Sequence, residues 1–193
     1  MPTRGCSNID VVRALAELLG ERAPHLRLVA HRDRDYLSDE SVERYTEITD
    51  ELNCGAFVTD FSDLEGYLLN PEHLHSLYPA VSVDRATELV EQATAATRGE
   101  SITAVINLRT DEARKIRARR GGNENPGALA VTAARDYDAN PRSMRRGKIV
   151  LGRLIALLQQ ELGENPDVKR SSGALRVERL QALAQAIWPP AGG

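Results

Sequence analysis

The chain has 193 residues, of which 41% are hydrophobic and 27% charged, so it can bury a core and wholesale disorder is excluded. No apolar run approaches the roughly 18–20 residues of a membrane span, and the amino-terminal segment lacks an apolar signal stretch. The two cysteines, Cys6 and Cys54, exclude a disulfide scaffold and a cysteine-rich zinc site, and they predict a cytoplasmic location.

Helices and strands are expected to alternate in the first part of the chain. Apolar residues recur at helical spacing over Ile9–Arg22, and Leu26–Ala30 form a short apolar run that predicts a buried strand. A second helix is expected to end near Leu52, and a second strand is predicted over Ala56–Thr59. This alternation predicts an α/β fold in which the two strands are parallel neighbours.

The rest of the chain is predicted to be mainly helical. The expected fold class is therefore α/β, with a small parallel-sheet core and a largely helical carboxyl-terminal half. One domain is expected over residues 1–193, divided into an α/β core at about 4–80, a helical lobe at about 84–140 and carboxyl-terminal helices at about 145–188. Helices are expected at 63–69, from Pro71, and at 84–97, 101–119, 148–162 and 174–187, with a loop at 121–127.

Charge is unevenly distributed along the chain, although the net charge is only −3. Residues 1–108 carry 9 basic and 19 acidic residues, whereas residues 109–148 carry 11 basic and 5 acidic ones. A basic segment within an acidic chain is typical of a surface that contacts phosphates. The same composition also fits a solvated helix followed by an arginine-rich loop, and the sequence leaves both interpretations open.

Acidic residues follow both predicted strands. Asp33 and Asp35 come directly after the first strand, and Asp60, Asp63 and Glu65 follow the second. In open α/β sheets, ligands bind outside the carboxyl ends of the strands, so these side chains can approach one another. Carboxylate oxygens are the ligands that Mg²⁺ or Mn²⁺ prefers, and the pattern predicts a divalent-cation site. The competing interpretation is that these acids only cap the helices that follow.

The two segments LRLVAHRDRDYL (26–37) and AFVTDFSDLEGYLLNPEHL (56–74) together resemble a known domain. It is the Toprim domain of OLD-family (overcoming lysogenization defect) nucleases and of related Toprim-like proteins paired with AAA-type ATPases. In that group a strand ends in D-x-D, and the next leads into D-[IL]-E-N-[YW]-[LF]. Here the second motif reads DLEGYL, with Gly66 where Asn is common. The resemblance covers about residues 4–80 and 144–163; Gly5-Cys6-Ser7-Asn8 is similar to a turn of that domain, and Arg146-Gly147-Lys148 to its late basic element.

The resemblance implies a metal-dependent nuclease that hydrolyses phosphodiester bonds in DNA or RNA, with a role in phage defence. It implies Asp33, Asp35 and Glu65 as catalytic metal ligands for Mg²⁺ or Mn²⁺. The strand-end pattern adds Asp63 as a further candidate ligand. Lys148 would be the basic group beside the scissile phosphate, where it would offset negative charge in the transition state. The implied partners are nucleic acid and an AAA-type ATPase or a second copy of the chain.

One departure from the family affects the expected activity. The family's first motif is a strand ending in glutamate, as in V-E-G-x-x-D, and it precedes the element similar to Gly5–Asn8. This sequence starts at Met1 and has no acid before Asp10 that could fill the role. The chain is therefore expected to be partial and weakly active alone, either because the gene product is truncated or because a partner supplies the strand.

Two alternative functions stay open. The chain could be a non-catalytic subunit or remnant that binds an ATPase partner or nucleic acid. It could also be a haloacid-dehalogenase-like phosphatase, whose D-x-D would make Asp33 the nucleophile and Asp35 the acid/base. Tyr36-Leu37 and the helical second half fit the phosphatase poorly, so it ranks last.

Overall fold

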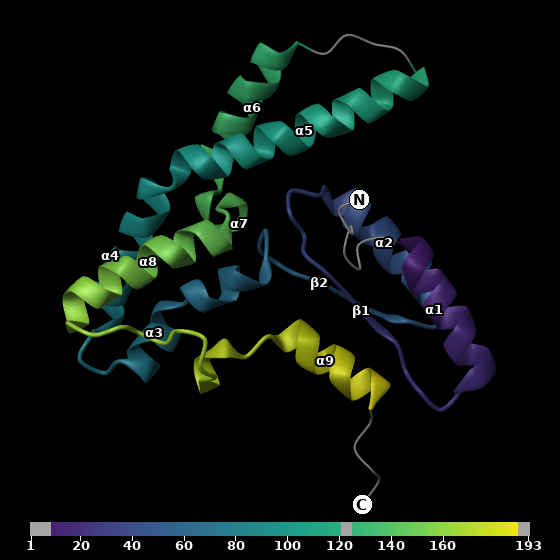
Figure 1. Ribbon diagram of the computed structural model, residues 1–193, viewed down its shortest axis with the longest axis horizontal. Helices are drawn as coiled ribbons and strands as arrows, with labels where there is room; N and C mark the ends of the chain where they lie inside the picture. Colours follow the sequence, from purple (N-terminus) through teal and green to yellow (C-terminus); the bar gives the residue numbers. More distant parts are fainter. Residues whose placement is uncertain (1–8, 121–124, 189–193) are drawn as a thin grey trace, which may run out of the picture. The chain divides into compact units, whose positions relative to one another are not determined.

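The computed structural model describes the backbone of residues 9–120 and 125–188 and, apart from residues 112, 113 and 115–120, their side chains. Two compact units make up the chain (Figure 1). Unit 1 comprises Met1–Asp60 with Arg176–Gly193, and unit 2 comprises Phe61–Leu175. The predicted fold class is confirmed, because a small parallel sheet is followed by a largely helical carboxyl-terminal half. The predicted organisation as one domain with three parts stays a prediction.

The sheet of unit 1 consists, among the described residues, of two strands, β1 (Val29–Arg32) and β2 (Gly55–Val58). They are parallel and in register from Val29 opposite Gly55 to Arg32 opposite Val58, which confirms the predicted pairing. The first strand begins three residues later than predicted and includes His31 and Arg32. The bounds are set by pairing rather than by apolarity, since Gly55 N–H donates to the Leu28 carbonyl and Thr59 N–H to the Arg32 carbonyl.

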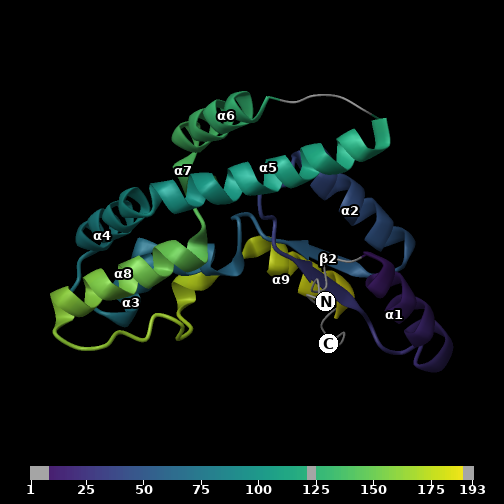
Figure 2. The same cartoon turned by 45° about the horizontal axis from the view of Figure 1, so that its top comes forward.

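Helices cover both faces of this sheet (Figures 1 and 2). The helices α1 (Ile9–Arg22) and α2 (Asp39–Glu51) bury Val12 and Tyr45 against a face that includes Ala30 and Val58. Side chains alternate along a strand, so Gly55 belongs to the opposite face, where α9 (Glu178–Ile187) packs on β2. Unit 1 is therefore a three-layer α/β/α arrangement in which the last helix covers the second strand.

The regular secondary structure of unit 2 consists, among its described residues, of helices alone. Its elements are η1 (Leu64–Leu69), α3 (Pro71–Leu77), α4 (Val83–Ala96), α5 (Arg98–Arg120), α6 (Pro126–Ala139), α7 (Pro141–Met144), α8 (Gly147–Leu162) and η2 (Gly173–Leu175). The core forms where α4 and α8 pack together, because Val150, Leu154 and Leu158 recur on one face of α8 and meet Leu89 of α4. Gly163, with φ of 74°, ends α8 in the left-handed conformation that favours glycine.

Two parts of the helical half differ from the prediction. The helices α6 and α7 were not predicted, although Asn125 accepts a hydrogen bond from Gly127 N–H as an N-cap and Pro126 occupies the first turn. The helix predicted over 174–187 is divided, because extended backbone at Val177 separates η2 from α9. Residues 121–124 of the predicted loop lie outside the described residues. Among the helices that are described, none is both long and apolar enough to cross a membrane.

Candidate functional site

The segment that carries Asp33 and Asp35 is tied to the end of the neighbouring strand. Arg34 N–H donates to the Thr59 hydroxyl at 2.8 Å, and Thr59 N–H donates to the Arg32 carbonyl at 3.1 Å. Thr59 is fully buried, so this link is shielded from water. The two predicted metal ligands therefore follow β1 at the same edge of the sheet at which β2 ends.

The surroundings of Asp33 and Asp35 differ. Asp33 Oδ1 lies 3.5 Å from Nε2 of His31, and the His31 ring stacks on Phe57 with 5.7 Å between ring centroids. Asp35 has a φ of 48°, a left-handed conformation that aspartate tolerates better than most residues. The turn that contains Asp35 is closed by a hydrogen bond from Leu37 N–H to the Arg34 carbonyl. A half-exposed carboxylate and a tight turn thus lie next to each other at the strand end.

Asp60, the acid that follows β2 in unit 1, is held by the last helix. Its Oδ1 accepts a hydrogen bond from Nη1 of Arg179 in α9 at 2.8 Å. This pair joins residues 119 positions apart and the arginine neutralises part of the charge at the sheet edge. No local pattern predicts this pair, since Arg179 stands in a predicted helix far along the chain.

In unit 2, the carboxylate of Asp63 connects the two short motifs of the resemblance. Its Oδ1 accepts a hydrogen bond from Gly66 N–H at 3.2 Å, which caps η1, and its Oδ2 accepts one from Lys148 N–H at 3.1 Å in the first turn of α8. Gly147 makes this approach possible, because a Cβ there would lie 2.1 Å from Asp63 Oδ1 and 2.5 Å from Gly66 N. Asp63 therefore caps helices, as the competing interpretation of the strand-end acids proposes.

Packing explains why Gly66 stands at the position where the resembled family commonly has asparagine. A Cβ on Gly66 would lie 2.5 Å from the Phe61 Cβ and 2.8 Å from its Cγ. Phe61 is also in edge-to-face contact with Tyr67, with 4.9 Å between the ring centroids. The departure from the motif therefore makes room for an aromatic pair that packs beside η1.

The predicted site residues are divided between the two units. Asp33 and Asp35 belong to unit 1, whereas Asp63, Glu65 and Lys148 belong to unit 2. Within either unit, as far as its residues are described, no three His, Cys, Asp or Glu side chains form a group that could hold a metal ion. The chemistry of Asp33 and Asp35 fits a hard cation that takes its remaining ligands from water, because Mg²⁺ usually keeps several waters.

The segment Gly5–Asn8, which is part of the resemblance, lies outside the described residues. The other segments that carry it are the end of β1, the stretch from β2 into η1, and the start of α8. Of these, the second and third contact each other through Asp63 and Lys148. No protein-family model, no curated protein and no solved structure matches this chain.

Proposed function

We propose that this chain is a Toprim-type, divalent-metal-dependent nuclease domain that hydrolyses phosphodiester bonds in DNA or RNA. The observation that carries the proposal is the parallel pairing of β1 with β2, after which Asp33 and Asp35 follow the first strand and Asp60 the second. Carboxyl ends of neighbouring parallel strands are where open α/β sheets bind ligands. A D-x-D sequence at that edge supplies oxygen ligands suited to Mg²⁺ or Mn²⁺.

In this proposal Asp33 and Asp35 of unit 1 hold the cation. Glu65 and Asp63, which the resemblance and the strand-end pattern indicate as further metal-binding acids, belong to unit 2. A divalent cation bound there would supply a water of lowered pKa and stabilise charge on the phosphate. The turn at Asp35 and the Arg34–Thr59 hydrogen bond keep the ligands in place before substrate arrives. Ordered ligands reduce the reorganisation that the reaction requires.

Lys148 is the proposed cation beside the scissile phosphate. Its side chain is exposed, and its backbone N–H is fixed by the Asp63 carboxylate in the first turn of α8. The helix dipole disfavours a positive charge in the first turn, so Lys148 does not stabilise α8 there. An anionic binding partner explains a lysine at this position better than helix stability does. A phosphate group of the nucleic acid would be such a partner.

The proposed setting is the cytoplasm, in phage defence, with an AAA-type ATPase or a second copy of the chain as partner. A non-catalytic subunit that binds such a partner or nucleic acid is the second candidate. It is favoured by Asp60 and Asp63, since the first is paired with Arg179 and the second caps two helices. Both carboxylates then have structural partners that compete with a metal.

Metal binding separates these functions, and calorimetry with Mn²⁺ measures it. We expect the Asp33→Asn, Asp35→Asn double variant to bind Mn²⁺ at least about tenfold more weakly, because both charged ligands are lost. The matched control is Glu43→Gln, Glu47→Gln, which removes two exposed acids from α2 of the same unit and leaves binding unchanged. Mn²⁺ binding that is equal in all three proteins would overturn the site assignment.

Cleavage assays with plasmid, single-stranded DNA and RNA test the reaction itself. We expect weak Mn²⁺-dependent cleavage by the chain alone, and a further fall of about 100-fold in Lys148→Gln and in Glu65→Gln, because the first removes a group that stabilises the transition state and the second a proposed metal ligand. Lys148→Gln should leave Mn²⁺ binding intact, because the lysine is not a ligand. Metal binding with nucleic-acid binding but without cleavage would favour the non-catalytic subunit.

A further inference from the structure

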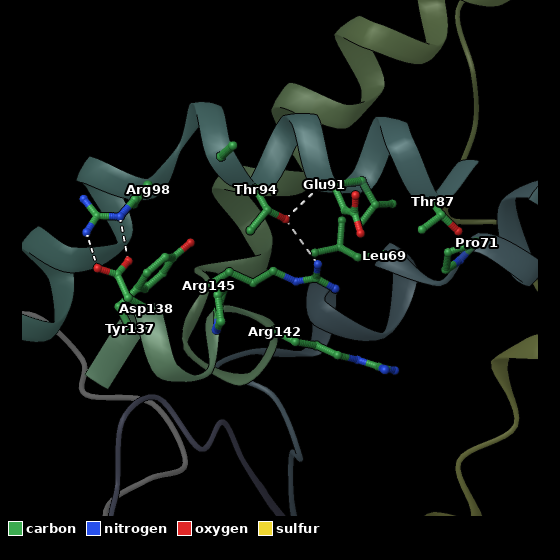
Figure 3. Close-up of a pocket in the computed structure, with 13 residues that line it drawn as sticks. Leu69, Pro71, Thr87, Glu91, Thr94, Arg98, Tyr137, Asp138, Arg142 and Arg145 are labelled. Carbon is green, nitrogen blue, oxygen red and sulfur yellow. Dashed lines mark hydrogen bonds and ion pairs between the residues drawn. The ribbon is translucent and has the colours of Figure 1, made fainter. Parts of the chain in front are cut away.

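Unit 2 contains a cavity that lies entirely within its own residues and involves none of the acids discussed above (Figure 3). Its volume is about 570 Å³, within the range of small-molecule sites. Leu69, Val90 and Pro141 contribute an apolar wall. Thr94, Arg142 and Arg145 also line the cavity. An apolar wall with a few convergent polar groups is typical of a binding site for an organic molecule.

The most unusual group in this cavity is the guanidinium of Arg145. The residue is only 7% exposed, and one Nη donates to the Thr94 hydroxyl at 3.2 Å. Its Nε is buried and has no hydrogen-bond partner among the described residues. In the described part of the chain, no carboxylate oxygen lies within 4.0 Å of a guanidinium nitrogen of Arg145, so the residue forms no ion pair there. A buried cation without a counter-ion is unfavourable, so the arrangement calls for an anion.

Electrostatics agree with the geometry. The pKa of Arg145 is lowered to about 10, mainly by burial and also by the positive charge of Arg142, while Tyr137 and Asp63 act in the opposite direction. The third arginine, Arg98, is already neutralised because its guanidinium donates to both carboxylate oxygens of Asp138 at 2.8 and 2.6 Å (Figure 3). The positive charge that is not compensated therefore belongs to Arg142 and Arg145.

The position of Arg145 is fixed by its backbone. Its carbonyl accepts a hydrogen bond from the buried Ser62 hydroxyl at 2.6 Å, and its N–H donates to the Pro141 carbonyl at 2.8 Å. Arg142 extends over the Phe61 ring with 5.8 Å to the centroid. The backbone of Arg145 and the Thr94 hydrogen bond to its guanidinium thus orient this side chain before any ligand binds, which reduces the entropy lost on binding.

We propose that this cavity binds a small organic anion in which one carboxylate or phosphate group is joined to an apolar body. The oxyanion pairs with Arg145 and Arg142, and the apolar body lies on Leu69, Val90 and Pro141. Arginine suits both headgroups because its planar fork donates two parallel hydrogen bonds. The site is independent of the proposed nuclease activity, since it uses none of the residues assigned to that reaction.

Calorimetry on the full chain in the presence of EDTA tests the proposal without a contribution from metal. The probes are octanoate, octyl phosphate, octanol and octylammonium, which share an alkyl chain and differ in headgroup. We expect saturable binding of octanoate or octyl phosphate with one site per chain, at least about tenfold tighter than octanol, because a hydrogen-bonded charged group is worth that much. The tighter of the two anions identifies the headgroup.

Three single variants test which residues bind the anion. Arg145→Gln should weaken binding about 10- to 100-fold. Arg142→Gln, at an exposed residue whose replacement does not threaten folding, should weaken it about two- to fivefold. Glu91→Gln removes the negative charge that also lines the cavity and should tighten binding. The matched control is Arg153→Gln on the exposed side of α8, which should change nothing.

Three results would overturn the proposal. The first is octanol or octylammonium binding as tightly as the anions, and the second is absence of binding by both anions at millimolar concentration. The third is anion binding that Arg142→Gln and Glu91→Gln leave unchanged. This third test can be made even if the Arg145→Gln variant does not fold. None of these results bears on Mn²⁺ binding at Asp33 and Asp35, so the two proposals fail separately.

Discussion

Asp63 and Lys148 are 85 residues apart in the sequence, yet the carboxylate of the first accepts a hydrogen bond from the backbone N–H of the second at 3.1 Å. The same carboxylate caps η1 through Gly66 N–H. One side chain therefore satisfies two helix amino termini, which otherwise leave backbone donors without partners. The contact joins the two motifs in unit 2 that carry part of the resemblance to the Toprim domain.

Gly147→Ala should disrupt this contact. The new Cβ would lie 2.1 Å from Asp63 Oδ1 and 2.5 Å from backbone at Gly66, so one of the two helices must move. We expect a loss of about 1–3 kcal/mol in the free energy of unfolding, measured by urea denaturation. Gly152→Ala in the same helix is the control, because a Cβ there meets nothing within 4 Å and should stabilise by about 0.5–1 kcal/mol. Equal effects of the two substitutions would contradict the packing described for Gly147.

Arg145→Met should leave the protein as stable as before, or more stable by about 1–3 kcal/mol, because it replaces a buried cation by an apolar group of similar length. The pKa of Arg145 is lowered to about 10 by burial, so the folded chain holds the proton less tightly than the unfolded chain. The cost is fully present at neutral pH and is relieved only as the pH rises through that value. Thermal melting without ligand measures the effect, and a clear loss of stability would assign Arg145 a structural role instead.

His73→Ala should be among the more damaging substitutions in unit 2. The side chain is fully buried, its Nε2 lies 2.9 Å from the Val168 carbonyl and its Nδ1 lies 2.8 Å from the Ser172 hydroxyl. A carbonyl only accepts, so Nε2 carries the proton and Nδ1 accepts from the serine. We expect a loss of about 2–4 kcal/mol in urea denaturation, from the cavity and the partners left unpaired. His25→Ala, at an exposed position, is the control and should stay within about 0.5 kcal/mol.

Cys54 should react slowly with thiol reagents while the chain is folded. The residue is 3% exposed, and burial raises the pKa of its thiol, so the reactive thiolate is scarce. The stability gained by burying the neutral thiol is lost as the pH rises through that raised pKa. In a Cys6→Ser background, we expect Ellman's reagent to react at least about tenfold faster in urea than with native protein near pH 8. Equal rates would show that the thiol is accessible.

Local sequence patterns predicted the elements whose ends are set locally. The helix at Ile9–Arg22 has the predicted bounds, and α8 starts one residue earlier than predicted, since both carry an apolar stripe at helical spacing. The first strand was displaced because its ends depend on the partner strand, which a single segment does not reveal. The helix α6 was missed because most of its apolar residues are alanines, which leave no pronounced apolar stripe in the sequence.

The candidate site residues likewise divide into those that a local sequence pattern reveals and those that depend on contacts between distant segments. Asp33 and Asp35 could be picked out because they are neighbours in the sequence at a predicted strand end. The Asp60–Arg179 pair could not, because it depends on α9 returning to β2 after 119 residues. Arg145 stood in a basic run that suggested an exposed phosphate-binding surface or a solvated loop. Its burial depends on contacts with Thr94, Pro141 and Ser62, which are a property of the folded unit.

The way unit 1 is assembled has a consequence for the order of folding during synthesis. The strands β1 and β2 precede unit 2 in the chain, whereas α9, whose Ile187 and Leu183 contact the Gly55 position, follows it. A ribosome therefore completes all of unit 2 before it makes the helix that covers β2. Prior folding of residues 61–175 shortens the loop that must close, which lowers the entropic cost of docking α9. Until then the face of the sheet to which Gly55 belongs lacks the helix that covers it in the finished fold.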